Sequence, residues 1–261
     1  LSKSLNIDIA IDLMTYTEGN RFGIFIEKCA PIQINYLGFP GTSGSDCIDY
    51  IIADKTLIPE DKQQFYSEKI VYMPNTYQVN ISKLTISKDH FDKKKINLPD
   101  KGFVFCCFNS TYKITPETFT GWMNILSKVD GSVLWLSKTN RTAIQNLKKE
   151  AQKLGIDPNR LIFASRLDAK EDHLNRIQSA DLFLDTLPFN AHTTTSDALR
   201  VGLPVLTRIG ESFTSRVAAS LLNAVNLPEL ITSSQEEYEA LAIELATNPD
   251  KLKIIKDKLA L

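Results

Sequence analysis

The chain has 261 residues, of which 43% are hydrophobic and 23% are charged, a composition typical of a globular protein with two medium-sized α/β units. Its 30 basic and 31 acidic residues give a net charge of −1, so no strong field attracts nucleic acid or an anionic membrane. No stretch approaches the roughly 18 apolar residues of a membrane span, and no signal-peptide pattern opens the chain. We therefore expect a cytoplasmic protein that binds neither nucleic acid nor membrane.

The first 80 residues predict a parallel sheet. Strand-like runs occur in "LNIDIAIDLMTYT", "PIQINYLGFPGTSG", "IDYIIAD" and "EKIVYMPN", with a short helical piece at 59–65. Apolar strands that alternate with loops and helices are typical of parallel sheets. The chain begins at Leu1 rather than Met and enters the first run almost at once. We therefore expect 1–80 to be the C-terminal part of an incomplete N-terminal lobe in a longer protein.

Residues 81–102 predict a linker between two domains. The segment from 80 to 102, "NISKLTISKDHFDKKKINLPDKG", is charged and has only a weak apolar pattern. Such composition is typical of an interdomain connection.

Residues 103–261 predict a Rossmann-like domain. The strand-like runs "FVFCCFN", "SVLWLSK", "LIFAS", "DLFLDT" and "PVLTR" alternate with helical segments, and two C-terminal helices are expected at about 213–224 and 235–259. Two such lobes facing each other fit a glycosyltransferase-B type architecture. Strand counting alone does not distinguish this architecture from other pairs of doubly wound domains.

Several helix ends carry local signals. Thr115, as N-cap before Pro116, opens the first helix after the linker. Gly155 closes the second helix, and Asp168 with Glu171 three residues later predicts a capping box.

The four cysteines show no metal-binding pattern. Cys106 and Cys107 are neighbours in an apolar run, so their side chains point to opposite faces of a strand. With Cys29 and Cys47 they lack the paired spacing of a zinc site, and we expect reduced thiols.

Open α/β sheets bind ligands beyond the carboxyl ends of their strands, and "FNSTYKI" follows one predicted strand directly. Ser110, Tyr112 and Lys113 stand there. The lysine ammonium can lie against a phosphate as a point charge. The alternative is an ordinary surface lysine.

The segment "SRLDAKEDHLNR" predicts a second polar group at a strand end. Lys170, His173 and Arg176 share one face of a helix that begins there. Positive charge at a helix N-terminus opposes the helix dipole unless an anion joins it. The pattern therefore favours a bound anion, although Glu171 and Asp172 could offset the charge.

The stretch "NAHTTTSDAL" predicts an anion site at another helix N-terminus. Thr193 or Thr194 is the expected N-cap, with hydroxyls and backbone N–H groups directed outward. Asp197, one turn further on, could accept hydrogen bonds from ribose hydroxyls or merely complete a capping box. The alternative is an over-capped helix with His192 as a satisfied loop histidine.

The turn "LGFPGTSG" brings Leu37, Gly38 and Pro40 into a tight bend where a ligand can approach the backbone; a plain turn is the alternative. No Asp-x-Asp motif occurs in the chain. The usual carboxylates for a metal-bound diphosphate are therefore missing, and we expect a site that uses neither metal nor other cofactor.

Together, these segments resemble the catalytic region of O-linked N-acetylglucosamine transferases and their bacterial SPINDLY-family relatives. The motifs run in order from "TYTEGNR" and "APIQINYLGFPGTSG" through "FCCFNSTYKITPETFTGWMNILSKVDGSVLWL" and "RLIFASRLDAKEDH" to "ADLFLDTLPFNAHTTTSDAL" and "SRVAAS". The resemblance implies two Rossmann-like lobes and an inverting, metal-independent transfer of N-acetylglucosamine from UDP to Ser or Thr hydroxyls of proteins.

The resemblance also implies roles for individual residues. Lys113 matches the lysine that steadies the departing diphosphate, and His192 matches a pyrophosphate contact and a catalytic residue. The remaining implied assignments are Ser110, Thr193 and Thr194 at the diphosphate; Leu167, Asp168, Lys170, His173, Arg176 and Asp197 at the nucleoside; and Leu37, Gly38, Pro40, Tyr112 and Phe189 around the sugar.

Some positions depart from the family pattern. Phe189 stands where animal enzymes carry a small cysteine beside the acetamido group, so UDP-glucose or GDP-fucose stays open as the donor. Ser110 replaces a glutamine, and Asp8 stands where animal enzymes place a histidine. We expect acceptor-binding tetratricopeptide repeats upstream in the full-length protein. A non-catalytic nucleotide-sugar-binding module and a two-lobed epimerase are the alternative functions.

Overall fold

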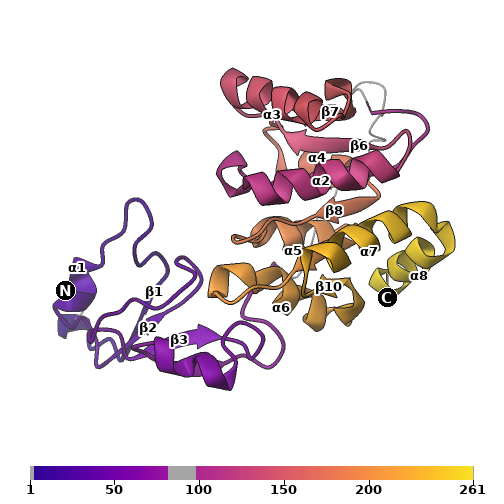
Figure 1. Ribbon diagram of the computed structural model, residues 1–261. Helices are drawn as coiled ribbons and strands as arrows, with labels where there is room; N and C mark the ends of the chain where they lie inside the picture. Colours follow the sequence, from indigo (N-terminus) through magenta and orange to yellow (C-terminus); the bar gives the residue numbers. More distant parts are fainter. Residues whose placement is uncertain (1–2, 82–97, 261) are drawn as a thin grey trace.

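The computed structural model describes residues 3–81 and 98–260, which form two separate parallel sheets (Figure 1). The fold prediction of two Rossmann-like lobes is confirmed in this respect. The central part of the predicted linker, 82–97, lies outside the described residues, and the boundaries drawn at 81 and 102 stay a prediction.

The first sheet has four strands in the order β1-β2-β3-β4. All neighbours are parallel, as the sequence predicted. The strands are β1 (Ile9–Asp12), β2 (Ile32–Asn35), β3 (Tyr50–Ala53) and β4 (Lys69–Tyr72). The helical segments are η1 (Lys3–Leu5), α1 (Gly23–Ile26) and η2 (Glu60–Phe65), of which η1 and η2 are 3₁₀ turns.

One face of this sheet is poorly covered. The register pairs Ile9 with Ile32 and Ile11 with Ile34, so these four side chains share a face. Ile9 is 51% exposed and Ile11 is 48% exposed, and Val71 on β4 is 40% exposed. Parallel sheets normally bury both faces. Within the described residues, this face therefore has no complete covering layer.

The second sheet has six parallel strands in the order β10-β9-β8-β5-β6-β7. Its strands are β5 (Val104–Cys107), β6 (Val133–Ser137), β7 (Leu161–Ala164), β8 (Leu182–Leu184), β9 (Val205–Arg208) and β10 (Ile231–Thr232). The chain fills one side of β5 with β6 and β7 and then returns to the other side with β8. The strand order therefore reverses between β5 and β8, which is the place where open α/β sheets bind ligands.

Helices and short 3₁₀ turns connect and flank these strands (Figure 1). The helices are α2 (Pro116–Lys128), α3 (Arg141–Lys153), α4 (Lys170–Ile177), α5 (Thr193–Arg200), α6 (Val217–Ala224), α7 (Gln235–Thr247) and α8 (Pro249–Leu259). The 3₁₀ turns are η4 (Thr111–Lys113), η5 (Pro158–Arg160), η6 (Phe213–Ser215) and η7 (Pro228–Leu230). No helix in the described ranges is long and apolar enough to cross a membrane.

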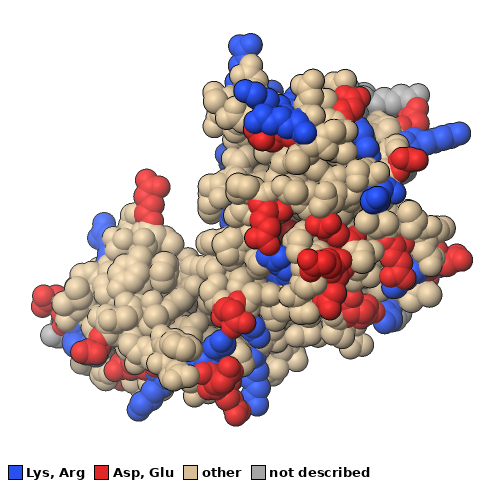
Figure 2. Space-filling view, viewed as in Figure 1, with Lys and Arg blue, Asp and Glu red and all other residues tan. Residues whose placement is uncertain are grey.

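Most of the hydrophobic core lies in the second lobe, around β5, and the same cluster includes Ile51 and Leu57 of the first lobe. All four β5 residues are buried, and Trp122 on α2 and Trp135 on β6 are fully buried beside them. The four cysteines are buried free thiols, as predicted. Acidic and basic side chains are interspersed on the face that Figure 2 shows, in keeping with the small net charge.

Two of the predicted helix ends are confirmed. The Thr115 side chain accepts a hydrogen bond from Thr118 N, with Pro116 at the first helical position. Gly155 follows α3 with φ +79°, the left-handed conformation expected of a C-terminal glycine.

The capping predictions for α4 and α5 are wrong. Helix α4 begins at Lys170 after Ala169, so Asp168 lies one residue too early to cap it. His192, rather than a threonine, is the N-cap of α5, and it makes no side-chain capping bond. Thr195 instead donates its hydroxyl to Ala191 O, because the preceding loop places that carbonyl one turn away (2.9 Å).

The predicted C-terminal helices are each divided in two. Asn248 ends α7 and caps α8 by accepting a hydrogen bond from Lys251 N. Pro249 cannot donate to a continuous helix, so it begins a new one. The segment 213–224 similarly consists of η6 followed by α6.

Asp54 joins the two lobes. Its carboxylate is 1% exposed and accepts hydrogen bonds from Tyr77 N (2.9 Å) and from the Ser220 hydroxyl on α6 (2.6 Å). Arg216 also donates to Thr56 O across the junction (2.6 Å). A buried carboxylate requires several donors, and here they come from both lobes.

Gly38 provides a test of the tight bend after β2. A Cβ atom at this position would lie 1.8 Å from Leu13 O, whereas a Cβ at Gly23 would meet nothing within 4 Å. We predict that Gly38→Ala lowers the free energy of unfolding by at least about 2 kcal/mol and that Gly23→Ala changes it by less than about 1 kcal/mol. Denaturant unfolding of the two variants measures this difference, and equal midpoints would contradict the close approach.

Candidate functional site

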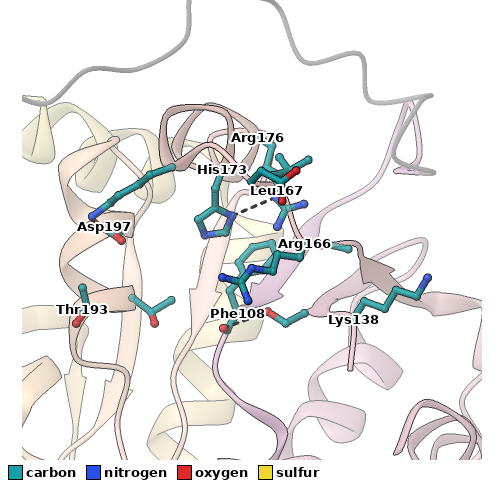
Figure 3. Close-up of a pocket in the computed structure, with 13 residues that line it drawn as sticks. Phe108, Lys138, Arg166, Leu167, His173, Arg176, Thr193 and Asp197 are labelled. Atoms are coloured by element: carbon teal, nitrogen blue, oxygen red, sulfur yellow. Dashed lines mark hydrogen bonds and ion pairs between the residues drawn. The ribbon is translucent and has the colours of Figure 1, made fainter. Parts of the chain in front are cut away.

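A pocket of about 540 Å³ lies at the carboxyl edge of the second sheet (Figure 3). Its wall comes from the residues that follow β5, β6 and β7 and from the first turns of α4 and α5. The lining residues are Phe108, Ser137, Lys138, Ala164, Arg166, Leu167, Asp168, Lys170, His173, Arg176, Thr193, Thr194 and Asp197. Ligand pockets commonly have volumes of roughly 300–1,000 Å³.

The pocket is electropositive. Four cations line it, Lys138, Arg166, Lys170 and Arg176, against the two carboxylates of Asp168 and Asp197. The first N–H groups of α5 lie at the same place, and they have no partners within their own helix. The arrangement therefore favours an anionic ligand.

One wall of the pocket is built from Phe108, His173 and Arg176. Arg176 is buried and donates through Nε to His173 Nδ1 (3.2 Å). The Phe108 ring packs edge-on against the imidazole, with 5.4 Å between ring centroids. Arg176 also donates to Ser165 O, so the guanidinium is held between α4 and the end of β7.

This wall keeps His173 neutral. Burial, followed by the positive charge of Arg176, lowers the pKa of His173 to about 4. Because Nδ1 accepts the hydrogen bond from Arg176, the proton of the neutral ring lies on Nε2. His173 is therefore a hydrogen-bond donor of fixed tautomer at neutral pH.

Asp197, which lines the pocket, is ion-paired. Lys170 Nζ lies 3.2 Å from Asp197 Oδ1, an oxygen that is itself buried. The ribose contact that the family resemblance implies for Asp197 stays a prediction.

A second cluster stands immediately beside the pocket. Lys113 Nζ donates to Asn190 O (2.8 Å) and lies 4.0 Å from the centroid of the Phe189 ring. The His192 ring stacks on Phe189 with 4.9 Å between centroids, and Tyr112 meets Phe189 edge-on at 6.3 Å. His192 directly precedes Thr193, a lining residue of the pocket, so the cluster adjoins the pocket along the chain.

Burial controls the charges in this cluster. It lowers the pKa of Lys113, against the opposing negative charge of Asp185. Burial and then the Lys113 ammonium lower the pKa of His192 to about 4, so this imidazole is neutral at pH 7. His192 Nε2 lies 3.3 Å from Thr214 O. A carbonyl only accepts, so the ring proton lies on Nε2 and Nδ1 is the free acceptor.

Most of the residues predicted from the sequence lie at this edge of the sheet, with some exceptions. The predicted nucleoside residues and the two threonines line the pocket, and Tyr112, Lys113, Phe189 and His192 form the cluster. Ser110 is exposed at the start of η4 and makes no capping bond with its side chain.

Among the described residues, none from the N-terminal lobe lines this pocket. Pro40 lines a separate groove of about 560 Å³ between the lobes, together with Phe65 and Phe213. Gly38 packs against the Leu13 backbone, and Leu37 turns the chain with φ +66°. Asp8 lies directly before β1, at its amino end, which is the opposite end from the carboxyl edge.

Five lining residues were missed at the sequence level: Phe108, Ser137, Lys138, Ala164 and Arg166. Each stands within two residues of the end of a strand. The rule that ligands bind beyond strand ends could have found them. The described residues contain no group of three or more His, Cys, Asp or Glu side chains that could hold a metal ion.

Comparison with known proteins places this geometry in context. The model of glycosyl transferase family 41 matches residues 3–96 and 87–261. A probable UDP-N-acetylglucosamine–peptide N-acetylglucosaminyltransferase SEC of Arabidopsis thaliana is 39% identical over 260 residues, covering 97% of this chain and 26% of that protein. A probable UDP-N-acetylglucosamine–peptide N-acetylglucosaminyltransferase SPINDLY of Petunia hybrida is 30% identical over 258 residues, covering 97% and 27%.

A solved structure shows the same fold. A variant of the Thermobaculum terrenum O-GlcNAc transferase matches with a TM-score of 0.88 and 28% identity, covering 99% of this chain and 49% of that one. The chain spans about a quarter of the length of the curated relatives described above.

The lowered pKa values of His173 and His192 predict that the folded protein loses stability in acid. Each has an ordinary pKa of 6.5 and a folded-state pKa of about 4, so the unfolded chain takes up protons first as pH falls through this window. Their stabilising contribution is present above pH 6.5 and is lost towards pH 4. We predict that His173→Gln, which retains a hydrogen-bond acceptor, reduces the fall in melting temperature between pH 7 and pH 4.

Parallel melting curves of the wild type and the variant isolate this contribution, because all other titrating groups are shared. Identical pH dependence of the two proteins would show that His173 is not a buried neutral group.

Proposed function

Because the chain belongs to glycosyl transferase family 41, we propose that the protein transfers N-acetylglucosamine from UDP-N-acetylglucosamine to Ser or Thr hydroxyls of proteins. The observation that carries this proposal is the electropositive pocket at the start of α5, together with the Lys113 ammonium that the carbonyl of Asn190 holds in the loop before this helix. Tetratricopeptide repeats upstream and a cytoplasmic location belong to the same proposal.

The donor binds across the pocket and the cluster in this scheme. The uracil lies beside Arg176 and the backbone at Leu167 and Asp168, and the ribose hydroxyls reach Asp197. The diphosphate lies at the N-terminus of α5, where the N–H groups of Thr193 and Thr194 are directed towards it. This order follows the family resemblance, and the position of His192 directly before the lining residue Thr193 supports it.

Transfer is a single displacement. The acceptor oxygen attacks the anomeric carbon from the face opposite the diphosphate, so a new C–O bond forms while the bond to the β-phosphate oxygen breaks. UDP leaves with the bonding electron pair, and the proton of the acceptor hydroxyl passes to solvent water. The configuration at the anomeric carbon is inverted.

Lys113 is the principal source of rate acceleration. Negative charge grows on the β-phosphate as the bond breaks, and a fixed ammonium in a partly desolvated site stabilises this charge strongly. The N-terminus of α5 adds partial positive charge. His192 Nε2 faces Thr214 O, so its Nδ1 serves as an acceptor for a hydroxyl or amide of the substrates. No divalent cation takes part in this scheme.

The position of Phe189 bears on which sugar donor the site binds. Its ring lies against Lys113 and His192 and occupies space where the family resemblance places the acetamido group. UDP-glucose, which lacks that group, and GDP-fucose are therefore the competing donors for the same site.

Ligand binding to the native state raises the melting temperature by mass action. We predict that UDP and UDP-N-acetylglucosamine stabilise the full-length protein by roughly 3 kcal/mol at 100 times their Kd and that a metal chelator leaves this effect unchanged. A thermal-shift series that includes UDP-glucose and GDP-fucose measures the preference. Stabilisation by GDP-fucose alone would overturn the UDP assignment.

Substitution of Lys113 separates catalysis from binding. We predict that Lys113→Ala lowers kcat by a factor of roughly 100 or more, the size typical of losing one charge-stabilising group, with a much smaller loss of UDP affinity. Lys128→Ala, at the exposed end of α2, is the matched control and should behave as wild type. Equal losses of kcat and UDP affinity would mean that Lys113 only binds ground-state phosphate.

A further inference from the structure

Asp185 is a buried carboxylate directly after β8, at the edge of the sheet that carries the site. It is 3% exposed and accepts short hydrogen bonds from Ala191 N (2.6 Å), Thr186 N (2.8 Å) and the Thr207 hydroxyl on β9 (2.7 Å). Asn109 Nδ2, at the end of β5, lies 3.4 Å away. One side chain thus gathers donors from β5, β9 and the loop that leads to α5.

The loop held by Asp185 carries the reactive cluster. Within it, the Thr186 hydroxyl donates to Phe189 O (2.6 Å), and Asn190 Nδ2 donates to Thr186 O (2.8 Å). Asn190 O is the acceptor that holds Lys113 Nζ at 2.8 Å. The hydrogen bond from Ala191 N to Asp185 therefore fixes the peptide unit whose carbonyl orients the ammonium.

Asp185 also supplies the negative charge behind Lys113. Three titratable groups act on this ammonium from the elements around it: Asp185 after β8, Cys107 on β5 and His192 at the start of α5. Burial raises the pKa of Cys107, so that side chain is a neutral thiol. His192 is neutral at pH 7 because its pKa is lowered to about 4. Of these three groups, Asp185 is therefore the one that carries a negative charge.

We infer that Asp185 is a positioning residue for sugar transfer, which holds the 186–192 loop and keeps the Lys113 ammonium charged and directed at the diphosphate. The inference rests on the proposed function. Asp185 lies behind the loop and touches neither the donor nor the acceptor in this scheme. Its role is exerted through Lys113 and Asn190.

The charge of Asp185 predicts a specific pH dependence of kcat/KM. Burial raises the pKa of Asp185 to about 6, while the bonds from Ala191, Thr207 and Thr186 act in the opposite direction. Above that pH the carboxylate is ionised and favours the protonated form of Lys113. Removing the charge lowers the pKa of Lys113, so the ammonium is lost at lower pH. The alkaline limb of kcat/KM, which reports groups of the free enzyme, then moves towards neutrality.

The test compares Asp185→Asn and Asp185→Glu in the full-length protein. We expect Asp185→Asn, which preserves shape and removes charge, to move the alkaline limb of kcat/KM down by about one pH unit or more, the effect of a unit charge several ångströms away. Asp185→Glu retains the charge, so its alkaline limb stays near that of wild type although the misplaced loop lowers kcat. UDP affinity measured over the same pH range should shift in the same direction by a smaller amount, because Lys113 contributes less to UDP binding than to transfer.

Asp181→Asn is the matched control. Asp181 directly precedes β8, at its opposite end, and also accepts a hydrogen bond from a backbone amide, Val104 N (2.9 Å). Its substitution should leave the pH profile unchanged. If Asp185→Asn does not fold, Thr207→Val serves instead. This change removes one hydrogen bond that stabilises the ionised Asp185 carboxylate. The acid limb of kcat/KM, where Asp185 becomes protonated, should then move to higher pH.

The outcomes separate this inference from the proposed function. Wild-type protein that binds UDP but transfers no sugar would count against the proposed function, and the pH dependence of UDP affinity would still test Asp185. A pH dependence in Asp185→Asn equal to that of wild type, or an alkaline shift in Asp185→Glu as large as in Asp185→Asn, would overturn the inference. For Thr207→Val, an unmoved acid limb would do the same.

Discussion

A parallel sheet has one constraint on which the whole site depends: all of its strands end at the same edge. The six strands of the second lobe therefore bring together residues from distant parts of the chain. Phe108 follows β5, Lys138 follows β6, Arg166 follows β7 and Asp185 follows β8. Because the strand order reverses between β5 and β8, helix α5 begins beside the end of β5, and Lys113 lies against the loop that precedes it.

Burial then decides which of these side chains carries charge. The two histidines are neutral, each with a partner that fixes its tautomer, whereas the Lys113 ammonium remains beside a buried carboxylate. A site organised in this way presents the Lys113 ammonium, the four cations of the pocket and the end of a helix to the ligand. Fixed charges and dipoles need no reorganisation when negative charge develops on a leaving group.

The parts of this structure that were predictable from sequence are those with local causes. Strand β5 is a continuous apolar run, and the cap at Thr115 depends only on its next three residues. The start of α5 was misassigned because His192 takes the cap position through a loop that Asp185 holds from another strand. Asp185 itself was overlooked, since a carboxylate at the end of an apolar run has no sequence signature of burial. The described lining of the pocket comes from the second lobe, where the predicted nucleoside residues also stand.

The central claim is that this site moves a sugar from a UDP-linked donor to a protein hydroxyl. The most direct measurement is intact-mass spectrometry of a library of serine- and threonine-containing peptides after incubation with the full-length protein and UDP-N-acetylglucosamine. The account predicts that modified peptides gain the mass of one N-acetylhexosamine residue per modified hydroxyl and that Lys113→Ala lowers the rate of this gain by a factor of roughly 100 or more. Peptides that stay unmodified with every donor, while UDP still stabilises the protein, would contradict it and indicate a nucleotide-sugar-binding module without transfer activity.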